Sequence, residues 1–204
     1  MRHYRRILVT GAGGFAGRHV LRQLRESFPA AELIAAVRSE QDEPPPPSHA
    51  DRIVPFDLQA PSHDEMFQAI RPDGVIHLAA QASVASSFRD PLASWQINLM
   101  GTVRFAEALL RHAPQARFVF ASSAEVYGLS FKSGVPLTEM APMCPINPYA
   151  ASKAACDLAI GEIALRGLDA VRLRAFNHTG AGQSDKFVVA SFARQIAQIE
   201  AGAD

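Results

Sequence analysis

The chain has 204 residues, enough to bury one sizeable hydrophobic core and too few for two domains of average size. Its apolar fraction of 48% and its charged fraction of 20% are typical of a globular protein. The formal net charge is zero, which argues against a nucleic-acid-binding protein and requires any anionic ligand to be held by a local group of residues.

The N-terminal segment is basic and runs into a short apolar stretch at residues 7–9. This stretch is too short for a signal peptide or a membrane span, so we expect a cytoplasmic protein with no membrane partner. The two cysteines, Cys144 and Cys156, form no CxxC pair, and no Cys/His cluster has the spacing of zinc ligands. We therefore expect reduced thiols and no metal site.

Short apolar runs alternate along the chain with segments of helical periodicity. The runs predict six strands, at residues 7–10, 32–37, 52–56, 74–79, 117–121 and 170–174. Apolar spacing predicts helices after residue 14, from a cap at Ser62 to near Ile70, and over 95–111, 149–166 and 187–199. Four prolines at 44–47 predict an exposed loop over 39–50. The alternation predicts an α/β fold, a Rossmann-type doubly wound parallel sheet with helices on both faces.

The segment TGAGGFAG at 10–17 joins the first predicted strand to the first predicted helix. Its glycines fit both the spacing Gly11-x-x-Gly14-x-x-Gly17 and the spacing Gly11-x-Gly13-x-x-Ala16. Glycine allows the backbone to approach a ligand closely, and the start of a helix offers unpaired N–H groups to an anion. The segment predicts a turn that binds the pyrophosphate of a dinucleotide, with a plain tight turn as the alternative.

The end of the second predicted strand bears on the choice of dinucleotide. An acidic residue that binds the ribose of NAD is expected about 20 residues after the glycine turn. The chain has Arg38 there, and its first carboxylate is Glu40. A guanidinium matches the geometry of a 2′-phosphate, so the sequence favours NADP, with NAD and a solvated arginine as the alternatives. Asp57 and Leu58, after the third strand, stand where an adenine could be held, unless Asp57 only forms a turn.

Tyr149 and Lys153 lie four residues apart on a predicted helix, so their side chains share one face. A tyrosine ordinarily has a pKa of about 10, and a nearby ammonium group lowers it. Such a pair can pass a proton to or from an alcohol or carbonyl oxygen. Ser122 and Ser123 follow the fifth strand, at the sheet edge where open α/β sheets bind ligands, and Asn147-Pro148 begins the tyrosine helix.

Six segments together resemble the extended short-chain dehydrogenases/reductases (the NAD-dependent epimerase/dehydratase family), which act on nucleotide sugars. They are TGAGGFAG at 10–17, HLAAQASV at 77–84, NLMGT at 98–102, SSAEVYG at 122–128, NPYAASK at 147–153 and RAFNHTGAGQ at 174–183. The last segment is most similar to the GDP-4-keto-6-deoxy-mannose reductases, whose near relatives are the GDP-mannose 4,6-dehydratases.

The resemblance implies a role for each matching residue. It implies that Tyr149 is the general acid/base, that Lys153 binds the nicotinamide ribose and lowers the pKa of Tyr149, and that Ser123 hydrogen-bonds the reacting sugar oxygen. It implies that the dinucleotide is bound by Gly11, Gly14, Phe15, Ala16, Gly17, Leu78, Ala79, Ala80, Gln81, Ser122, Phe176 and His178. It further implies that Asn98 braces the fourth and fifth strands near the cofactor, and that Asn177 reaches the sugar phosphate.

Glu125 leaves two reactions open. In the sugar dehydratases that resemble this chain, a glutamate two residues after the catalytic Ser/Thr removes the C5 proton, but acidic residues here also occur in reductases, decarboxylases and epimerases. The dehydratases usually carry threonine in place of Ser123, and NHTGAGQ is more like the reductases. We therefore expect an enzyme that uses NADPH to reduce the C4 keto group of a GDP-4-keto-6-deoxy sugar. The alternatives are GDP-mannose 4,6-dehydration, another nucleotide-sugar epimerase or dehydratase, and a non-catalytic dinucleotide-binding module.

Families of this type are about half as long again, and their C-terminal part supplies much of the sugar pocket. We therefore expect residues 1–204 to form the NAD(P)-binding Rossmann domain, with about 175–204 leading into a substrate-binding part that is largely absent. The expected partners are a nucleotide sugar, GDP-linked by preference, and a second copy of the chain. The stripe Trp95, Leu99 and Val103 is expected to pack in the core or at a dimer seam. Of the remaining polar residues, His77 is expected to be a packed histidine, and Arg172 or Arg174 to meet a sugar phosphate or solvent.

Overall fold

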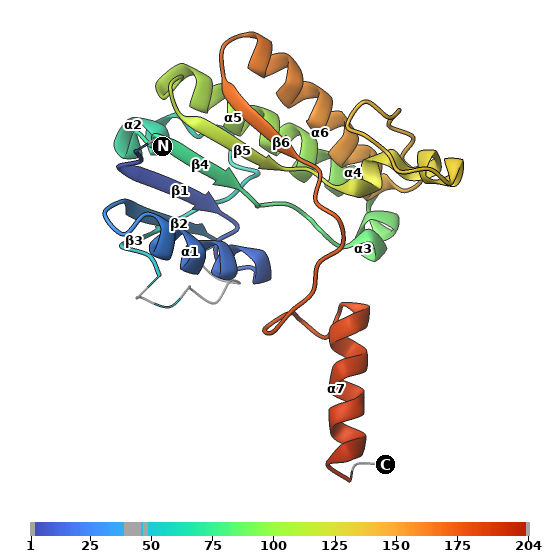
Figure 1. Cartoon of the computed structure of the whole chain (residues 1–204). Helices are drawn as coiled ribbons and strands as arrows, with labels where there is room; N and C mark the ends of the chain where they lie inside the picture. Colours follow the sequence, from blue (N-terminus) through green and yellow to red (C-terminus); the bar gives the residue numbers. More distant parts are fainter. Residues whose placement is uncertain (1–2, 39–45, 47–48, 203–204) are drawn as a thin grey trace.

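The computed structural model describes residues 3–38, 46 and 49–202. Six strands form one parallel sheet in the order β3-β2-β1-β4-β5-β6 (Figure 1). The strands are β1 (Arg6–Thr10), β2 (Glu32–Val37), β3 (Arg52–Pro55), β4 (Gly74–His77), β5 (Arg117–Ala121) and β6 (Asp169–Leu173). The strand order reverses between β1 and β4, where open α/β sheets have a crevice at their carboxyl ends. This confirms the predicted doubly wound sheet, whereas the predicted loop over 39–50 falls mostly outside the described residues.

The helices connect the strands and are more varied than the sequence predicts. They are α1 (Phe15–Ser27), α2 (Asp64–Ile70), α3 (Val84–Arg89), α4 (Pro91–Ser94), the π-helix η1 (Trp95–Gly101), α5 (Thr102–His112), the 3₁₀ segment η2 (Ala124–Ser133), α6 (Pro148–Leu165) and α7 (Val188–Glu200). The predicted cap at Ser62 is displaced by one residue, because His63 occupies the N-cap position of α2. The Ser62 hydroxyl still accepts a hydrogen bond from the Asp64 amide at 3.1 Å.

Successive side chains of each strand face opposite sides of the sheet and enter two separate cores. On one side, Ile7 and Val9 pack with Leu21 of α1. On the other side, Leu8 joins a larger core with Phe105 of α5 and Ile160 of α6. Because both faces are covered here, the central strands are continuous apolar runs, as the sequence predicts.

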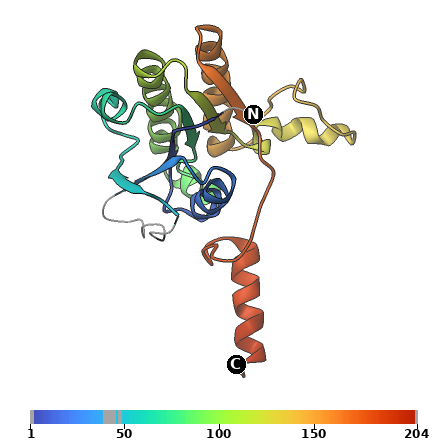
Figure 2. The ribbon, with the colours of Figure 1, turned by 60° about the vertical axis from the view of Figure 1, so that its left-hand side comes forward.

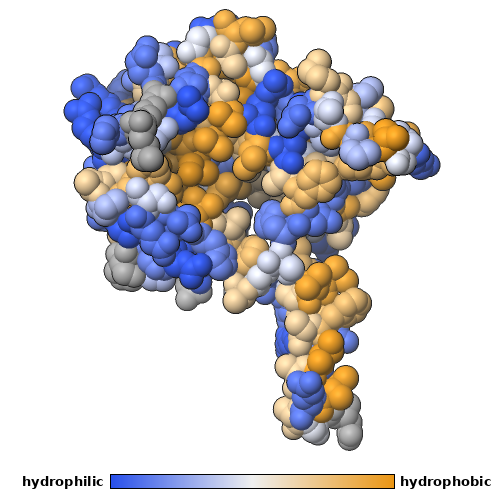
Figure 3. Space-filling model, in the orientation of Figure 1, coloured by the Kyte–Doolittle hydropathy of each residue, from blue (hydrophilic) through white to orange (hydrophobic). Residues whose placement is uncertain are grey.

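Helix α1 covers one face of the sheet at β1 and β2. At β5 and β6 the same face is more exposed to solvent. Val119 is paired in register with Val171, and Ala121 with Leu173, on the side opposite Phe118 and Phe120. Val171 is 39% exposed and Leu173 is 53% exposed. Figure 3 shows apolar residues gathered over this part of the molecule.

After β6 the chain leaves the sheet, and α7 extends away from it in both ribbon views (Figures 1 and 2). None of the residues of α7 is buried. Within the described part of the chain, no helix has the length and apolar character needed to cross a membrane.

The predicted helix over 95–111 is a π-helix followed by an α-helix. A Cβ atom on Gly101, where the two meet, would lie 2.6 Å from the carbonyl oxygen of Leu58. The helix therefore approaches the loop after β3 so closely that only glycine fits. Leu99, from the predicted apolar stripe, packs against the larger core.

We predict that Gly101→Ala destabilises the fold, although alanine ordinarily stabilises a helix relative to glycine by about 1 kcal/mol. The added methyl group meets backbone rather than a flexible side chain, so we expect a net loss of about 1–3 kcal/mol in the free energy of unfolding. Urea denaturation measures this difference, and a gain in stability would contradict the close contact with Leu58.

Candidate active site

The glycine turn between β1 and α1 has the geometry of an anion-binding turn. Gly11 has a φ of 68°, and a Cβ atom on it would lie 2.8 Å from the amide nitrogen of Ala79. A Cβ atom on Gly17 would overlap the Gly11 carbonyl. Gly14 is the N-cap residue of α1, and no side chain caps the helix there. The first amide groups of α1, at Phe15 and Ala16, therefore face a turn that offers them no side-chain acceptor.

The turn is held to the centre of the sheet by His77 at the end of β4. Its Nδ1 lies 2.8 Å from the Thr10 hydroxyl and its Nε2 lies 3.1 Å from the Thr102 hydroxyl. Burial lowers the pKa of His77 to about 3, so the ring is neutral at physiological pH. His77 is thus a packed histidine, as expected, and its partners are two threonine hydroxyls.

The loop after β4 carries Leu78, Ala79, Ala80 and Gln81, and it is tied to α6 by Asn98 of the π-helix. The Asn98 side chain accepts from the Gln81 amide at 2.8 Å and donates to the Gln81 carbonyl at 3.1 Å and to the Ser152 hydroxyl at 3.0 Å. The expectation that Asn98 braces β4 and β5 is therefore wrong, because its side-chain contacts go to the loop and to α6. Among the described residues, the buried Oε1 of Gln81 has no hydrogen-bond partner, which leaves an acceptor for a ligand.

The residues expected around the ribose and adenine lie at the carboxyl ends of β2 and β3. Arg38 follows β2 and is exposed. The Asp57 carboxylate accepts from the Gln59 amide at 2.9 Å, so it forms the turn that was the alternative interpretation. Leu58 is buried beneath Gly101. Their roles toward a cofactor stay predictions.

The start of α6 brings Tyr149 to Ser123. Asn147 caps the helix by accepting from the Ala150 amide at 2.7 Å, and Pro148 occupies its first turn, as predicted. Burial raises the pKa of Tyr149, a hydrogen bond with Ser123 lowers it, and the negative charge of Glu125 raises it, with a net increase. The sequence led us to expect a lowered pKa, so the phenol of this structure is instead held protonated.

Lys153 lies one turn further along α6 and is buried. Its ammonium group donates to the Ala121 carbonyl at 2.5 Å and lies 4.4 Å from the centre of the Phe120 ring. Burial lowers the pKa of Lys153 to about 8. Because the amine is directed at the end of β5, it does not produce the expected decrease in the pKa of Tyr149.

Glu125 is held beside these residues by the helix cap. Its Oε2 accepts from the Asn147 side-chain amide at 3.0 Å. Asn147 thus caps α6 through one atom and positions Glu125 through the other. The three polar residues that the sequence predicts at the reacting centre, Ser123, Glu125 and Tyr149, are therefore close together.

Asp157 of α6 is a shared partner of Ser122, Arg172 and Arg174, and the sequence did not single it out. The Ser122 hydroxyl donates to Asp157 at 2.7 Å, and its expected contact with the dinucleotide stays a prediction. Arg172 and Arg174 both form ion pairs with Asp157, and the Arg172 side chain is also 38% exposed, whereas that of Arg174 is 12% exposed. Contact of either arginine with a sugar phosphate stays a prediction. Asp157 could have been noticed, because it follows Lys153 by four residues on the same helical face.

The segment after β6 crosses to the glycine turn. The His178 ring is stacked on Phe15, with the ring centres 6.2 Å apart and the planes 11° apart. His19 of α1 lies 3.1 Å from the Ala181 carbonyl oxygen. Phe176 and Asn177 are exposed. The expected placement of 176–178 near the cofactor is consistent with this path, and their roles stay predictions.

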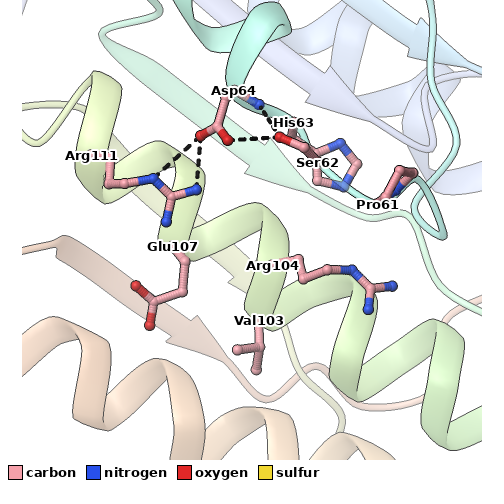
Figure 4. Close-up of a pocket in the computed structure, with 8 residues that line it drawn as sticks. All are labelled: Pro61, Ser62, His63, Asp64, Val103, Arg104, Glu107 and Arg111. Carbon is pink, nitrogen blue, oxygen red and sulfur yellow. Dashed lines mark hydrogen bonds and ion pairs between the residues drawn. The ribbon is translucent and has the colours of Figure 1, made fainter.

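Two hollows adjoin α2, away from the reacting centre. One has a volume of about 270 Å³ and is lined by Pro61, Ser62, His63, Asp64, Val103, Arg104, Glu107 and Arg111 (Figure 4). Arg111 reaches across it to the Asp64 carboxylate at 2.7 Å. The other, of about 400 Å³, includes Asp57 and is the only one of the two to contain a predicted site residue. In the described ranges, no group of three or more His, Cys, Asp or Glu residues is arranged to hold a metal ion.

Comparison with known proteins gives a family match over nearly the whole chain. The sequence signature of the NAD dependent epimerase/dehydratase family matches residues 7–204. GDP-6-deoxy-D-mannose reductase from Pseudomonas aeruginosa is 36% identical over 198 residues, which are 97% of this chain and 60% of that protein. dTDP-glucose 4,6-dehydratase from Streptomyces antibioticus is 32% identical over 93% of this chain and 58% of that protein.

Solved structures agree with this match. The structure of RMD from Pseudomonas aeruginosa complexed with NADPH is similar, with a TM-score of 0.78 and 33% sequence identity. The match covers 98% of this chain and 64% of the RMD chain. The structure of UDP-glucose 4-epimerase from Thermus thermophilus in complex with NAD has a TM-score of 0.82 and 29% sequence identity. That match covers 97% of this chain and 63% of the epimerase chain. The chain spans less than two thirds of each of these four relatives.

We predict that His77 makes the fold less stable in acid. The unfolded chain binds a proton at the ordinary histidine pKa of about 6.5, whereas the folded chain binds it only near 3, so stability is lost as the pH falls through this range. Between pH 6.5 and 5 the free energy of unfolding should decrease by about 1.5 kcal/mol from this group. His77→Gln should remove that decrease, as measured by urea denaturation at several pH values. The exposed His3→Gln is the control, and equal pH dependence in the two variants would contradict the assignment.

Proposed function

Since the chain belongs to the NAD dependent epimerase/dehydratase family, we propose that it is the cofactor-binding part of an NADPH-dependent reductase. The substrate we propose is a GDP-4-keto-6-deoxy sugar, reduced at its C4 keto group. The observation that carries the proposal is the hydrogen-bonded contact of Tyr149 with the Ser123 hydroxyl at the carboxyl end of β5. The 36% identity to GDP-6-deoxy-D-mannose reductase supports the substrate class.

The residues present fit a dinucleotide. Gly11 and Gly17 allow the turn to pack tightly against the backbone of Ala79 and Gly11, and the N-terminus of α1 has no side-chain cap, so its first amide groups are available to a pyrophosphate. The unpartnered Oε1 of Gln81 would accept from a ribose hydroxyl. Lys153, an ammonium group at the same sheet edge, would bind the nicotinamide ribose. When bound, NADPH supplies a hydride.

The protonation of Tyr149 suits a reductase. Reduction of a keto group leaves negative charge on its oxygen, which must receive a proton. The phenol of Tyr149 is in its acid form at neutral pH, as its raised pKa requires, and it is the group beside Ser123 that can donate that proton. The Ser123 hydroxyl can donate a hydrogen bond to the same oxygen and stabilise the developing charge. Tyr149 then regains its proton from solvent.

Glu125 favours dehydration of GDP-mannose as a second candidate. Elimination of water from a 4-keto sugar needs a base besides the tyrosine, and Asn147 holds the Glu125 carboxylate beside Tyr149. A dinucleotide-binding module without catalysis would require only the glycine turn. The presence of Ser123 and Tyr149 in hydrogen-bonded contact therefore favours an enzyme.

We propose NADP as the cofactor on the strength of Arg38, whose guanidinium suits a 2′-phosphate. RMD from Pseudomonas aeruginosa is complexed with NADPH, and the Thermus epimerase is in complex with NAD. We also propose a homodimer. The exposed Leu158 and Leu165 on α6 would provide apolar surface for a second copy.

We predict that the intact protein oxidises NADPH when GDP-4-keto-6-deoxy-mannose is offered, and that Tyr149→Phe lowers kcat by about 100-fold or more because the proton donor is lost. Loss of NADPH absorbance measures the rate, and fluorescence titration should show unchanged NADPH binding. The control is Tyr4→Phe, which lies against Phe28 outside the site. Water loss from GDP-mannose without NADPH oxidation would replace the reductase proposal with the dehydratase.

We predict that Arg38→Asp shifts the preference of the intact protein from NADPH to NADH by about tenfold or more, because the carboxylate repels a 2′-phosphate and accepts from a ribose hydroxyl. The ratio of kcat/KM for the two cofactors measures the shift. An unchanged ratio would remove Arg38 from the specificity determinants.

A further inference from the structure

Asp157 has the only fully buried side-chain carboxylate among the ion pairs of the described residues, and the chemistry above does not use it. Its Oδ2 accepts from the Ser122 hydroxyl at 2.7 Å and from Arg174 Nε at 3.0 Å. Its Oδ1 accepts from Arg172 at 3.0 Å and from the second nitrogen of Arg174 at 2.9 Å. Burial raises the pKa of Asp157, but the hydrogen bonds from Arg174 and Ser122 outweigh it, so the carboxylate is ionised.

The network around this carboxylate joins β6 to the three segments that bear the predicted reacting residues, which are the end of β5, η2 and α6. Ser122 precedes Ser123 at the end of β5, and Asp157 follows Lys153 by one turn of α6. Arg174 also donates to the Tyr127 hydroxyl at 2.8 Å, and Tyr127 belongs to the segment η2 that contains Glu125. The network therefore joins the segments at a point just beneath their functional side chains.

Helix α6 contacts the end of β5 through two polar side chains. Lys153 donates to the carbonyl of Ala121, and Asp157 accepts from the hydroxyl of Ser122. The two helix residues are one turn apart, and the two strand residues are adjacent, so the backbone leading into Ser123 is fixed in both position and direction. A misplacement of about 1 Å in an active site can cost about 100-fold in rate.

Stability alone does not account for a buried carboxylate of this kind. Desolvating the charges offsets most of their attraction, and apolar replacements of buried ion pairs are often neutral or stabilising. We propose that Asp157 is a positioning residue, which holds the strand end carrying Ser123 against the helix carrying Tyr149 and Lys153. This inference rests on the proposed function in so far as those three residues perform the chemistry.

The first test measures position without any substrate. In Asp157→Asn the charge is removed at nearly constant size. The matched control is Asp64→Asn, because Asp64 also accepts from two basic side chains, Arg111 and His112 of α5. In the intact protein, hydrogen–deuterium exchange should become at least about tenfold faster over residues 121–127 in Asp157→Asn only. Equal exchange of this segment in the two variants would overturn the proposal.

The second test uses Ser122, through which Asp157 acts, and remains available if Asp157→Asn does not fold. Ser122→Ala should lower kcat by about tenfold or more with less than a threefold change in the KM for NADPH, and Ser122→Thr should restore the rate. The control is Ser87→Ala, which removes another buried hydroxyl that donates a bond of 2.7 Å, to the Val84 carbonyl. An equal effect of the Ser87 and Ser122 variants, or no rescue by threonine, would reduce Asp157 to a purely structural role.

The outcomes separate the two proposals. If the wild-type protein oxidises no NADPH with the keto sugar, the proposed function fails, and the exchange measurement alone decides whether Asp157 holds the strand end. If the wild-type protein is active and the exchange of 121–127 changes without any loss of kcat in Ser122→Ala, the reductase stands and the positioning inference is wrong.

Discussion

The packing of α6 against the carboxyl end of β5 determines the geometry of the candidate site. Cys156, Ile160 and Ile163 of α6 are in the same core as Phe118 and Phe120 of β5, so an apolar contact fixes the distance between helix and strand. The polar contacts of Lys153 and Asp157 then fix where along the strand the helix stops. Hydrophobic burial is not directional, whereas hydrogen bonds are, and the site uses both. Without this arrangement the serine and tyrosine would be two unrelated residues far apart in sequence.

The same packing decides the protonation of the site. The phenol of Tyr149 is placed near a carboxylate and out of reach of the amine that would ionise it, because the Lys153 ammonium is directed at a backbone carbonyl. The spacing of one helical turn is therefore not sufficient to pair a tyrosine with a lysine. A positively charged nicotinamide ring, which follows hydride transfer, would lower the pKa of the phenol, so the proton affinity of Tyr149 would change in step with the redox state of the cofactor.

The sequence predicts the parts of this protein that local chemistry decides. Apolar runs predict the six strands described, and the glycine spacing, the proline after Asn147 and the helical periodicity predict the glycine turn and α6. The predictions fail where residues far apart in sequence come into contact. The π-helix depends on the contact of Gly101 with Leu58, and the partners of Ser122 depend on a carboxylate on another element. The resemblance singles out Asn98, yet the partners of its side chain follow from the path of the loop after β4. No periodicity in the sequence encodes such pairings.

The crossing of residues 174–183 over the glycine turn has a mechanical consequence. His178 stacks on Phe15, and His19 contacts Ala181, so the first turns of α1 and the segment after β6 are neighbours. In sequence the two are far apart, because strands β2 to β6 lie between them. A ligand that pushes on one of them pushes on the other. The stacked rings of Phe15 and His178 would pass such a displacement from the first turn of α1 to the segment after β6, and no strand of the sheet takes part in this contact.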